Sequence, residues 1–145
     1  MPCCDWMHSA ALTGNPKAKM RMSKPPRSWL GTPAEQEFDL DALHEPTIIF
    51  SGVARTAASK YPKNSNVAAM LAFATAGLDA TEVELVADPT DDSVRVLVDF
   101  ASDGGKISYE MQGVPSPENP RTGSDVPYSV VKAIKNLASP VSIGT

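Results

Sequence analysis

Apolar and polar residues alternate along several short segments of the chain, which is the pattern of a strand with one buried face. A β-branched and aromatic run at residues 47–50 predicts a further strand, and Ser51 and Gly52 predict its end. The alternating segments are residues 19–24, 82–87, 94–100 and 106–111. We therefore expect a sheet of at least four strands that contains the last three of these segments.

Glycine and proline residues indicate how the later segments are joined. Asp103, Gly104 and Gly105 predict a hairpin turn, because glycine adopts positive φ angles at little cost. The two strands on either side of this turn should be antiparallel neighbours. Residues 114–121 contain prolines at positions 115, 117 and 120, which predicts a loop, and residues 141–143 predict a final edge strand.

Helical patterns lie between these strands. Asn64, Ser65 and Asn66 predict the start of a helix, because their side chains can accept hydrogen bonds from the amides of the first turn. The residues that follow, up to Gly77, are apolar on nearly every face, so we expect this helix to be buried all round. The other expected helices are residues 5–12, 53–61 and 126–137, with one or two helical turns in 38–43.

This order of elements predicts an α+β fold, with a mixed, largely antiparallel sheet and helices packed on one face. We expect the strands to follow one another as a meander. The chain has no G-x-G-x-x-G and no G-x-x-x-x-G-K-[ST] motif, so it does not contain a nucleotide-binding βαβ start.

Length and charge narrow the class of protein. The 145 residues fit one domain, and the formal net charge of -4 argues against a basic nucleic-acid binder. No apolar run approaches the ~18 residues of a membrane span, and the first residues do not have the pattern of a signal peptide. We expect a soluble, cytoplasmic protein with no nucleic-acid or membrane partner.

The cysteines and histidines give little support to a disulfide scaffold or a metal site. Cys3 and Cys4 are adjacent, and neither His8 nor His44 lies at a ligand spacing from a second His or Cys. A catalytic pair of Cys4 and His8 would have helical i,i+4 spacing; the alternative is an incidental terminus. Asp88, together with residues 91–92, could bind a divalent cation, with a solvated loop as the alternative.

Two other segments could carry chemistry. Residues 61–66 open the most apolar helix, where free amides and the helix dipole favour an anion and Lys63 adds positive charge. The alternative is an ordinary helix cap. Residues 115–123 form a proline-stiffened loop that presents Asn119, Arg121 and Thr122, and an arginine can grip a carboxylate with two hydrogen bonds. The alternative is a connecting loop.

Several motifs along the chain are, in the same order, similar to the L-aspartate dehydrogenase family. The strongest are the KNSNVAA segment and the proline-rich loop. The motifs are KPPRSW (24–29), GTPAE (31–35), DLDAL (39–43), FSGVAR (50–55), YPKNSNVAA (61–69), VADP (86–89), VPSPENPRT (114–122) and IGT (143–145). The resemblance covers the C-terminal, catalytic and dimerisation domain of the family, with residues 1–17 as a remnant of the linking helix.

The resemblance implies an NAD(P)-dependent oxidoreductase that converts L-aspartate to iminoaspartate in pyridine nucleotide biosynthesis. It implies a homodimer, and a Rossmann domain that this chain lacks. Oxaloacetate with ammonia would be the substrates of the reverse reaction. The choice between NAD and NADP stays open, as does another small amino or oxo acid as substrate. The rival hypothesis is a truncated or catalytically inactive paralogue that acts as a binding or dimerisation module.

Residue by residue, the resemblance assigns one contact securely. Asn66 matches the asparagine that contacts the nicotinamide. An ungapped comparison anchored at residues 87–89 and 114–116 places the family's catalytic histidine on Val96, so no catalytic residue is assigned, and Lys63 is the first candidate to replace it. The substrate-binding candidates are Lys63, Asn64, Asn119, Arg121 and Thr122; no metal is expected.

Overall fold

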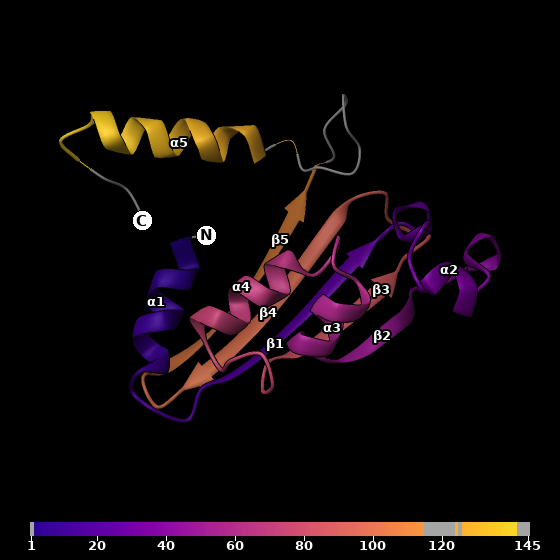
Figure 1. Cartoon of the computed structure of the whole chain (residues 1–145), viewed down its shortest axis with the longest axis horizontal. Helices are drawn as coiled ribbons and strands as arrows, with labels where there is room; N and C mark the ends of the chain where they lie inside the picture. The colour runs from indigo at the N-terminus through magenta and orange to yellow at the C-terminus, as the bar shows by residue number, and fades with distance from the viewer. Residues whose placement is uncertain (1, 115–123, 125, 142–145) are drawn as a thin grey trace.

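A five-stranded sheet with helices on one face forms the body of the chain (Figure 1). The computed structural model describes residues 2–114, 124 and 126–141. The strands are β1 (Lys17–Lys24), β2 (Thr47–Val53), β3 (Glu82–Ala87), β4 (Val94–Ser102) and β5 (Gly105–Gly113). The predicted α+β class is confirmed, and so is the sheet of at least four strands.

The strand order is β2-β3-β1-β4-β5, so the first strand lies in the centre of the sheet. It is parallel to β3 and antiparallel to β4, while the β2–β3 and β4–β5 pairs are antiparallel. The mixed, largely antiparallel sheet and the β4–β5 hairpin are confirmed. The expected meander is wrong, because β1 separates β3 from β4. A parallel pair needs a long crossover connection, and the segment between β1 and β3 supplies it.

The helices α1 (Pro2–Ala11), α3 (Ala54–Lys60) and α4 (Asn66–Ala74) cover one face of the sheet (Figure 1). Three short elements follow β1, at the edge where β1 and β3 end: η1 (Pro26–Trp29), α2 (Ala34–Glu37) and η2 (Leu40–Ala42). Of the helical turns expected at residues 38–43, one 3-10 turn is present. The last helix, α5 (Val126–Ala138), agrees with the prediction and stands apart from the other helices in Figure 1.

The core lies between the sheet and these helices. Alternate residues of the central strands point into it, and the T-shaped contact of Trp6 with Phe100 packs α1 onto β4. The central strands β1, β3 and β4 contribute Met20, Met22, Val83, Leu85, Val96, Val98 and Phe100 to the core. The strand period therefore places Val96 on the helix-covered face, where it is 1% exposed.

Strand β2 runs further than its sequence indicates. Ser51 and Gly52 continue the strand to Val53 instead of ending it, and the register with β3 shifts between Ile48 and Phe50. A Cβ atom on Gly52 would lie 2.9 Å from the Phe50 ring. Gly52 therefore leaves room for the Phe50 ring beside the backbone, and it does not mark a break.

Helix α4 differs from its prediction at both its start and its surface. Ser65 precedes the helix, but its hydroxyl donates to the carbonyl oxygen of Ala57 at 3.0 Å, so it ties α4 to α3 and does not cap it. Met70 and Phe73 are 65% and 67% exposed, so α4 is not buried all round. The helix has the sheet on one side only, and its opposite side is uncovered in the described part of the chain.

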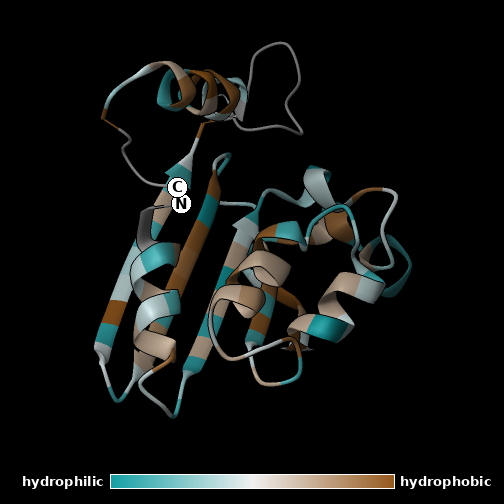
Figure 2. Cartoon of the chain, turned by 60° about the vertical axis from the view of Figure 1, so that its left-hand side comes forward, coloured by the Kyte–Doolittle hydropathy of each residue, from teal (hydrophilic) through white to brown (hydrophobic). Residues whose placement is uncertain are grey.

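The other face of the sheet is polar and carries both signs of charge. Glu84 of β3 accepts from Lys19 and Arg21 of β1, each at 2.7 Å. Helix α5 is amphipathic, and its apolar residues, which are brown in Figure 2, are exposed. Of the expected strand at residues 141–143, only Val141 is described, and it is not in a strand; the rest lies outside the described residues. Among the described helices, none has the length and apolar character needed to cross a bilayer.

The Glu84 ion pairs give a pH-dependent contribution to stability. Hydrogen bonds from Lys19 and then Arg21 lower the pKa of Glu84 below its ordinary value. A lowered carboxyl pKa stabilises the fold above the unfolded pKa of ~4.3, and this stabilisation is lost as the pH falls through the folded pKa. We expect Glu84→Gln to lower the free energy of unfolding by about 0.5–1 kcal/mol at pH 7. At pH 3 the difference should shrink.

Urea unfolding at both pH values measures this effect. Glu45→Gln is the matched control, because the Glu45 side chain is exposed in the segment before β2. An equal effect of Glu84→Gln at the two pH values would contradict the role of the ionised carboxylate.

Candidate functional site

A cavity of about 190 Å³ lies at the carboxyl end of β1, where the segment after β1 meets the turn between α3 and α4. Its described lining includes two lysines and no carboxylate. The lining residues are Lys24, Ser28, Leu30, Gly31, Thr32, Lys63, Asn64 and Val94. Ligand pockets for drug-sized molecules are usually ~300–1,000 Å³, so this cavity suits a smaller molecule that carries negative charge.

The end of β1 is fixed by the residues that follow it. Pro25 and Pro26 have no amide to donate to a sheet, so the strand ends at Lys24 and a 3-10 turn begins. Trp29 at the end of that turn is fully buried, and its indole N–H donates to the Lys24 carbonyl oxygen at 3.3 Å. The Thr32 hydroxyl donates to the Trp29 carbonyl oxygen at 2.6 Å. These contacts fold the segment back over the end of β1 and form one wall of the cavity.

The opposite wall is the turn between α3 and α4. Tyr61 is buried and packs edge-on against Trp29, with ring centroids 6.1 Å apart. Its carbonyl oxygen accepts from the Asn64 amide at 3.0 Å, which fixes the turn. The aromatic contact therefore sets the spacing between the two walls, and it places Asn64 opposite the end of β1.

Lys24 and Asn64 join the two walls directly. The Lys24 Nζ donates to Asn64 Oδ1 at 2.9 Å, and it lies 5.7 Å from the Trp29 ring centroid. Burial lowers the pKa of Lys24, because the charged ammonium loses water that the neutral amine needs less. Sequence reasoning did not single out Lys24 as a site residue. The available signal was its position at the start of the KPPRSW motif, directly before two prolines.

Of the sequence-predicted site residues, the structure brings Lys63 and Asn64 together in this cavity. Lys63 is exposed, and it also lines an adjacent hollow of about 170 Å³ beside Lys60, Tyr61 and Pro62. Asn64 is 8% exposed. Lys63 therefore lies at the mouth of the site, whereas Asn64 lies inside it.

Asn66 does not line the cavity. It is the first residue of α4 and is exposed, and its side-chain oxygen accepts from the Val67 amide at 3.0 Å. Its side-chain NH₂ can donate to a carbonyl oxygen such as that of a carboxamide, so the residue fits a nicotinamide contact. Asn119, Arg121 and Thr122 lie outside the described residues.

Val96 lies below the cavity and not in it. It is part of the packed core, while Val94, two residues earlier on the same strand face, lines the cavity wall. Val96, the position that the family comparison assigns to a histidine, is thus buried in the core. It lies two residues along β4 from Val94, which lines the cavity.

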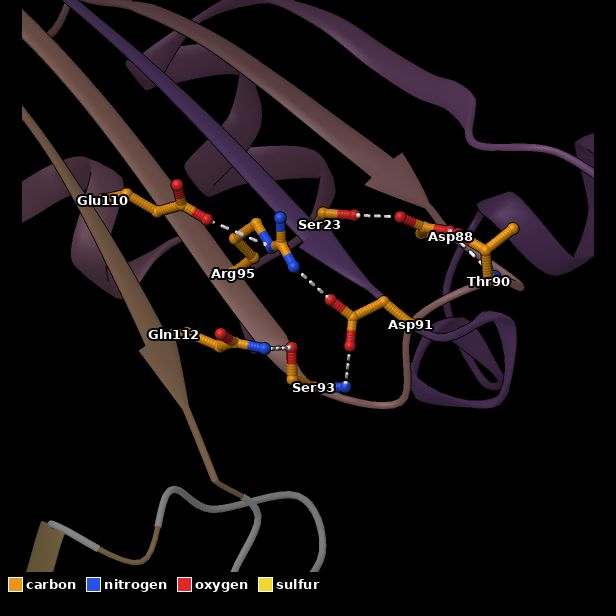
Figure 3. Close-up of polar contacts among 8 residues, drawn as sticks. All are labelled: Ser23, Asp88, Thr90, Asp91, Ser93, Arg95, Glu110 and Gln112. Carbon is orange, nitrogen blue, oxygen red and sulfur yellow. Dashed lines mark hydrogen bonds and ion pairs between the residues drawn. The ribbon is translucent and has the colours of Figure 1, made fainter.

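The acidic segment after β3 is occupied by contacts within the protein (Figure 3). Asp88 accepts from the amide and hydroxyl of Thr90, and Asp91 accepts from the Ser93 amide and from Arg95. The Ser93 hydrogen bonds, and then Arg95, lower the pKa of Asp91. Within residues 2–114, 124 and 126–141, no three His, Cys, Asp or Glu side chains are grouped as metal ligands. These carboxylates act as local supports for the loop.

Cys4 and His8, the other alternative weighed from the sequence, both lie on α1. Cys4 is half-buried, and the exposed His8 has its Nδ1 3.3 Å from the Ala74 carbonyl oxygen. Neither residue lines the cavity. The pair is therefore separate from the site at the end of β1.

Comparison with known proteins gives one consistent family. A family model described as "Aspartate dehydrogenase, C-terminal" matches residues 5–137. An L-aspartate dehydrogenase of Ralstonia pickettii is 52% identical over 120 residues, which cover 83% of this chain and 45% of the relative. One of Acinetobacter baumannii is 40% identical over 139 residues, which cover 96% of this chain and 53% of the relative. The chain thus spans about half the length of the relatives it matches.

The fold comparison agrees. The crystal structure of an aspartate dehydrogenase from Thermotoga maritima matches with a TM-score of 0.69 and 24% identity, over 97% of this chain and 51% of that one. At this identity the match supports the fold alone, and the sequence matches supply the family. The chain therefore belongs to the aspartate dehydrogenase family and corresponds to its C-terminal domain.

Proposed function

We propose that this chain is the substrate-binding part of an NAD(P)-dependent L-aspartate dehydrogenase, which oxidises L-aspartate to iminoaspartate. The observation that carries the proposal is the cavity at the end of β1, where Lys24, Lys63 and Asn64 converge. The family membership of the chain supports it, because the matched relatives are named for this activity.

The chemistry of the lining suits a small dicarboxylate. Two lysines, Lys24 inside and Lys63 at the mouth, without a carboxylate among the described lining residues favour an anion in the cavity. An ion-paired hydrogen bond between an ammonium and a carboxylate is stronger than a neutral one, and partial burial strengthens it further. The hydroxyl groups of Ser28 and Thr32 and the amide of Asn64 can supply further hydrogen bonds. L-Aspartate and oxaloacetate both carry two carboxylates.

A nicotinamide dinucleotide would accept the hydride from the substrate Cα when it is bound. In our proposal Asn66 holds the carboxamide of that ring from the start of α4, and the choice between NAD and NADP stays open. The larger part of the dinucleotide-binding surface would come from the half of the relatives that this chain does not span. We propose further that residues 1–17 correspond to the segment that links the two halves, and that the protein acts in the cytoplasm.

We also propose that two copies pair through the uncovered face of the sheet. A two-fold contact needs a surface that complements itself. On this face Leu97 of β4 is 38% exposed, and its register partners are Arg21 on one side and Glu110 on the other. A hollow of about 540 Å³ on the same sheet is lined by charges of both signs, including Lys19 and Asp99. Opposite charges can therefore meet across a two-fold axis around an apolar centre.

Binding of succinate and L-aspartate to the chain tests the cavity. We expect both dicarboxylates to shift the NMR signals of the lining residues, and the monocarboxylate butyrate to bind more weakly. Removing one charged hydrogen bond costs about 1.5–3 kcal/mol, so Lys63→Gln should weaken succinate binding by ~10-fold or more. Lys132→Gln, at an exposed position of α5, is the control. No binding of either dicarboxylate, or an equal loss in both variants, would disprove the assignment of the cavity.

Calorimetry with NADH tests the cofactor assignment. The chain alone should bind NADH weakly, because Asn66 supplies little of the dinucleotide surface. Fusion to the N-terminal half of a matched relative should raise the affinity, and Asn66→Ala should then lower it by ~5–10-fold, the loss of one hydrogen bond. Gln36→Ala, at an exposed position of α2, serves as the control. Micromolar binding by the chain alone would contradict this account.

Light scattering tests the pairing. We expect twice the chain mass of 15.4 kDa, and Leu97→Asp should shift the protein to the monomer, because it buries an unpaired charge in the contact. Phe73→Asp on the helix side should leave the dimer intact. A monomeric wild-type protein would refute the pairing, and a dimer sensitive only to Phe73→Asp would place the contact on the other side.

A further inference from the structure

We propose that Lys24 is the proton-transferring group of this site and accepts the proton of the substrate's amino group during oxidation. This inference rests on the proposed function and adds to it a catalytic residue that the family comparison does not assign. Three observations carry it: the place of Lys24 on the sheet, the surroundings of its Nζ, and its contrast with Lys63.

The position of Lys24 on the sheet brings it to the cavity from the core side. Lys24 shares a strand face with Met22, whose register partner on β4 is Val96. On the other side of β1, Lys24 is paired with Ala87 of β3. Lys24 is therefore one strand repeat above the Met22–Val96 pair, and its side chain lines the cavity together with Val94. An amine here reaches the space above the position where the family comparison puts a histidine.

The surroundings of Nζ favour an exchangeable proton. Its hydrogen-bond partner, Asn64 Oδ1, is uncharged, and the described lining of the cavity contains no carboxylate. The other charged residue of the described lining is Lys63, at the cavity mouth, and Asp88 follows β3 beside the end of β1 without lining the cavity. The Asp88 amide donates to the Lys24 carbonyl oxygen, while its carboxylate accepts from Thr90 and Ser23. Burial lowers the pKa of Lys24, which has no ion pair with a carboxylate among the described residues, so its neutral form is present at a lower pH than in an ordinary lysine.

Lys63 lines the same cavity but lies in a different environment. Its side chain is exposed at the mouth, so water solvates its ammonium. A solvated ammonium at the mouth suits a carboxylate contact. The two lysines thus have different roles: Lys63 attracts and holds the dianion, and Lys24 exchanges the proton.

Neutral Lys24 takes one proton from the substrate ammonium and becomes an ammonium itself. The C–H bond at the substrate Cα would then break, and a bound oxidised nicotinamide would accept its electron pair with the hydrogen as hydride. The nitrogen lone pair would form the C=N bond at the same time, which gives the protonated imine. In the reverse reaction, Lys24 returns the proton to the amine.

The first test measures the protonation of Lys24 in the chain by itself. A pH titration of the lysine ε-carbon signals by NMR should show one lysine that titrates at lower pH than the others, and Lys24→Arg should remove that signal. Lys63→Arg should leave it in place. Titration of Lys24 at the ordinary lysine value would overturn the proposal without any assay of activity.

The second test uses the chain fused to the dinucleotide-binding half of a matched relative. Arginine keeps the positive charge but does not release its proton, so Lys24→Arg should lower kcat for L-aspartate by ~10²–10⁴-fold. The rise of kcat with pH through the Lys24 pKa should disappear. Lys63→Arg should instead change KM and retain the pH profile, and Lys132→Arg, at an exposed position of α5, is the outside control.

The possible results separate the two proposals. A fusion that binds NADH and dicarboxylates but does not oxidise L-aspartate would show that the proposed function is wrong, and the proton-transfer role with it. An active fusion in which Lys24→Arg keeps kcat and its pH profile would overturn only the role of Lys24. If the Lys24→Ala fusion oxidises L-aspartate slowly and added primary amines restore its rate, the result would support proton transfer by Lys24. Added amines would not rescue a purely structural defect.

Discussion

The central strand β1 is the constraint on which the rest of the structure depends. It is hydrogen-bonded on both sides, to β3 in parallel and to β4 in antiparallel register, so neither half of the sheet is complete without it. Met20 and Met22 place its inner face in the core, and Lys24 is the next residue on that face. The same alternation that buries the methionines therefore places the Lys24 amine at the end of the sheet. The site is a continuation of the core and not an addition to its surface.

Partial burial of a lysine is costly, and the structure shows what offsets that cost. A charged group that leaves water must find hydrogen bonds or lose its charge. Asn64 supplies a hydrogen bond, the face of Trp29 supplies a polarisable surface, and the edge-on packing of Trp29 against Tyr61 holds both in place. Two segments far apart in the sequence, residues 24–29 and 61–64, are thus coupled through one side chain. Such a desolvated group is common at functional sites, where its altered proton affinity is useful.

The sequence predicted individual elements much better than their neighbours in space. Strands with a period of two, such as 82–87 and 94–100, agree with β3 and β4 because the period reflects one buried face. Their pairing with β1 depends on residues about 60–80 positions away, which no local pattern encodes, so the meander was wrong. In the same way, Gly52 was interpreted as a break because the Phe50 ring that requires it is visible only in three dimensions.

The candidate site shows the same difference between what local sequence patterns predict and what depends on contacts between distant residues. Lys63 and Asn64 could be predicted because they belong to one short polar segment at the start of a helix. Lys24 could not, since its distinctive property is burial by Trp29 and Asn64, and a lysine at the end of a strand has no sequence signal of desolvation.

Strand β4 shows why position 96 and the cavity differ in role. Its inner face changes from core to cavity wall between Val96, which is 1% exposed, and Val94, which is half-buried beside Lys24. A polar side chain at position 96 would need a hydrogen-bond partner within a layer that consists of Met22 and its apolar neighbours. Valine removes that requirement and leaves β4 with a packing role. The polar side chains of the site then come from β1 and from the turn before α4, on the two walls that the Trp29–Tyr61 contact joins.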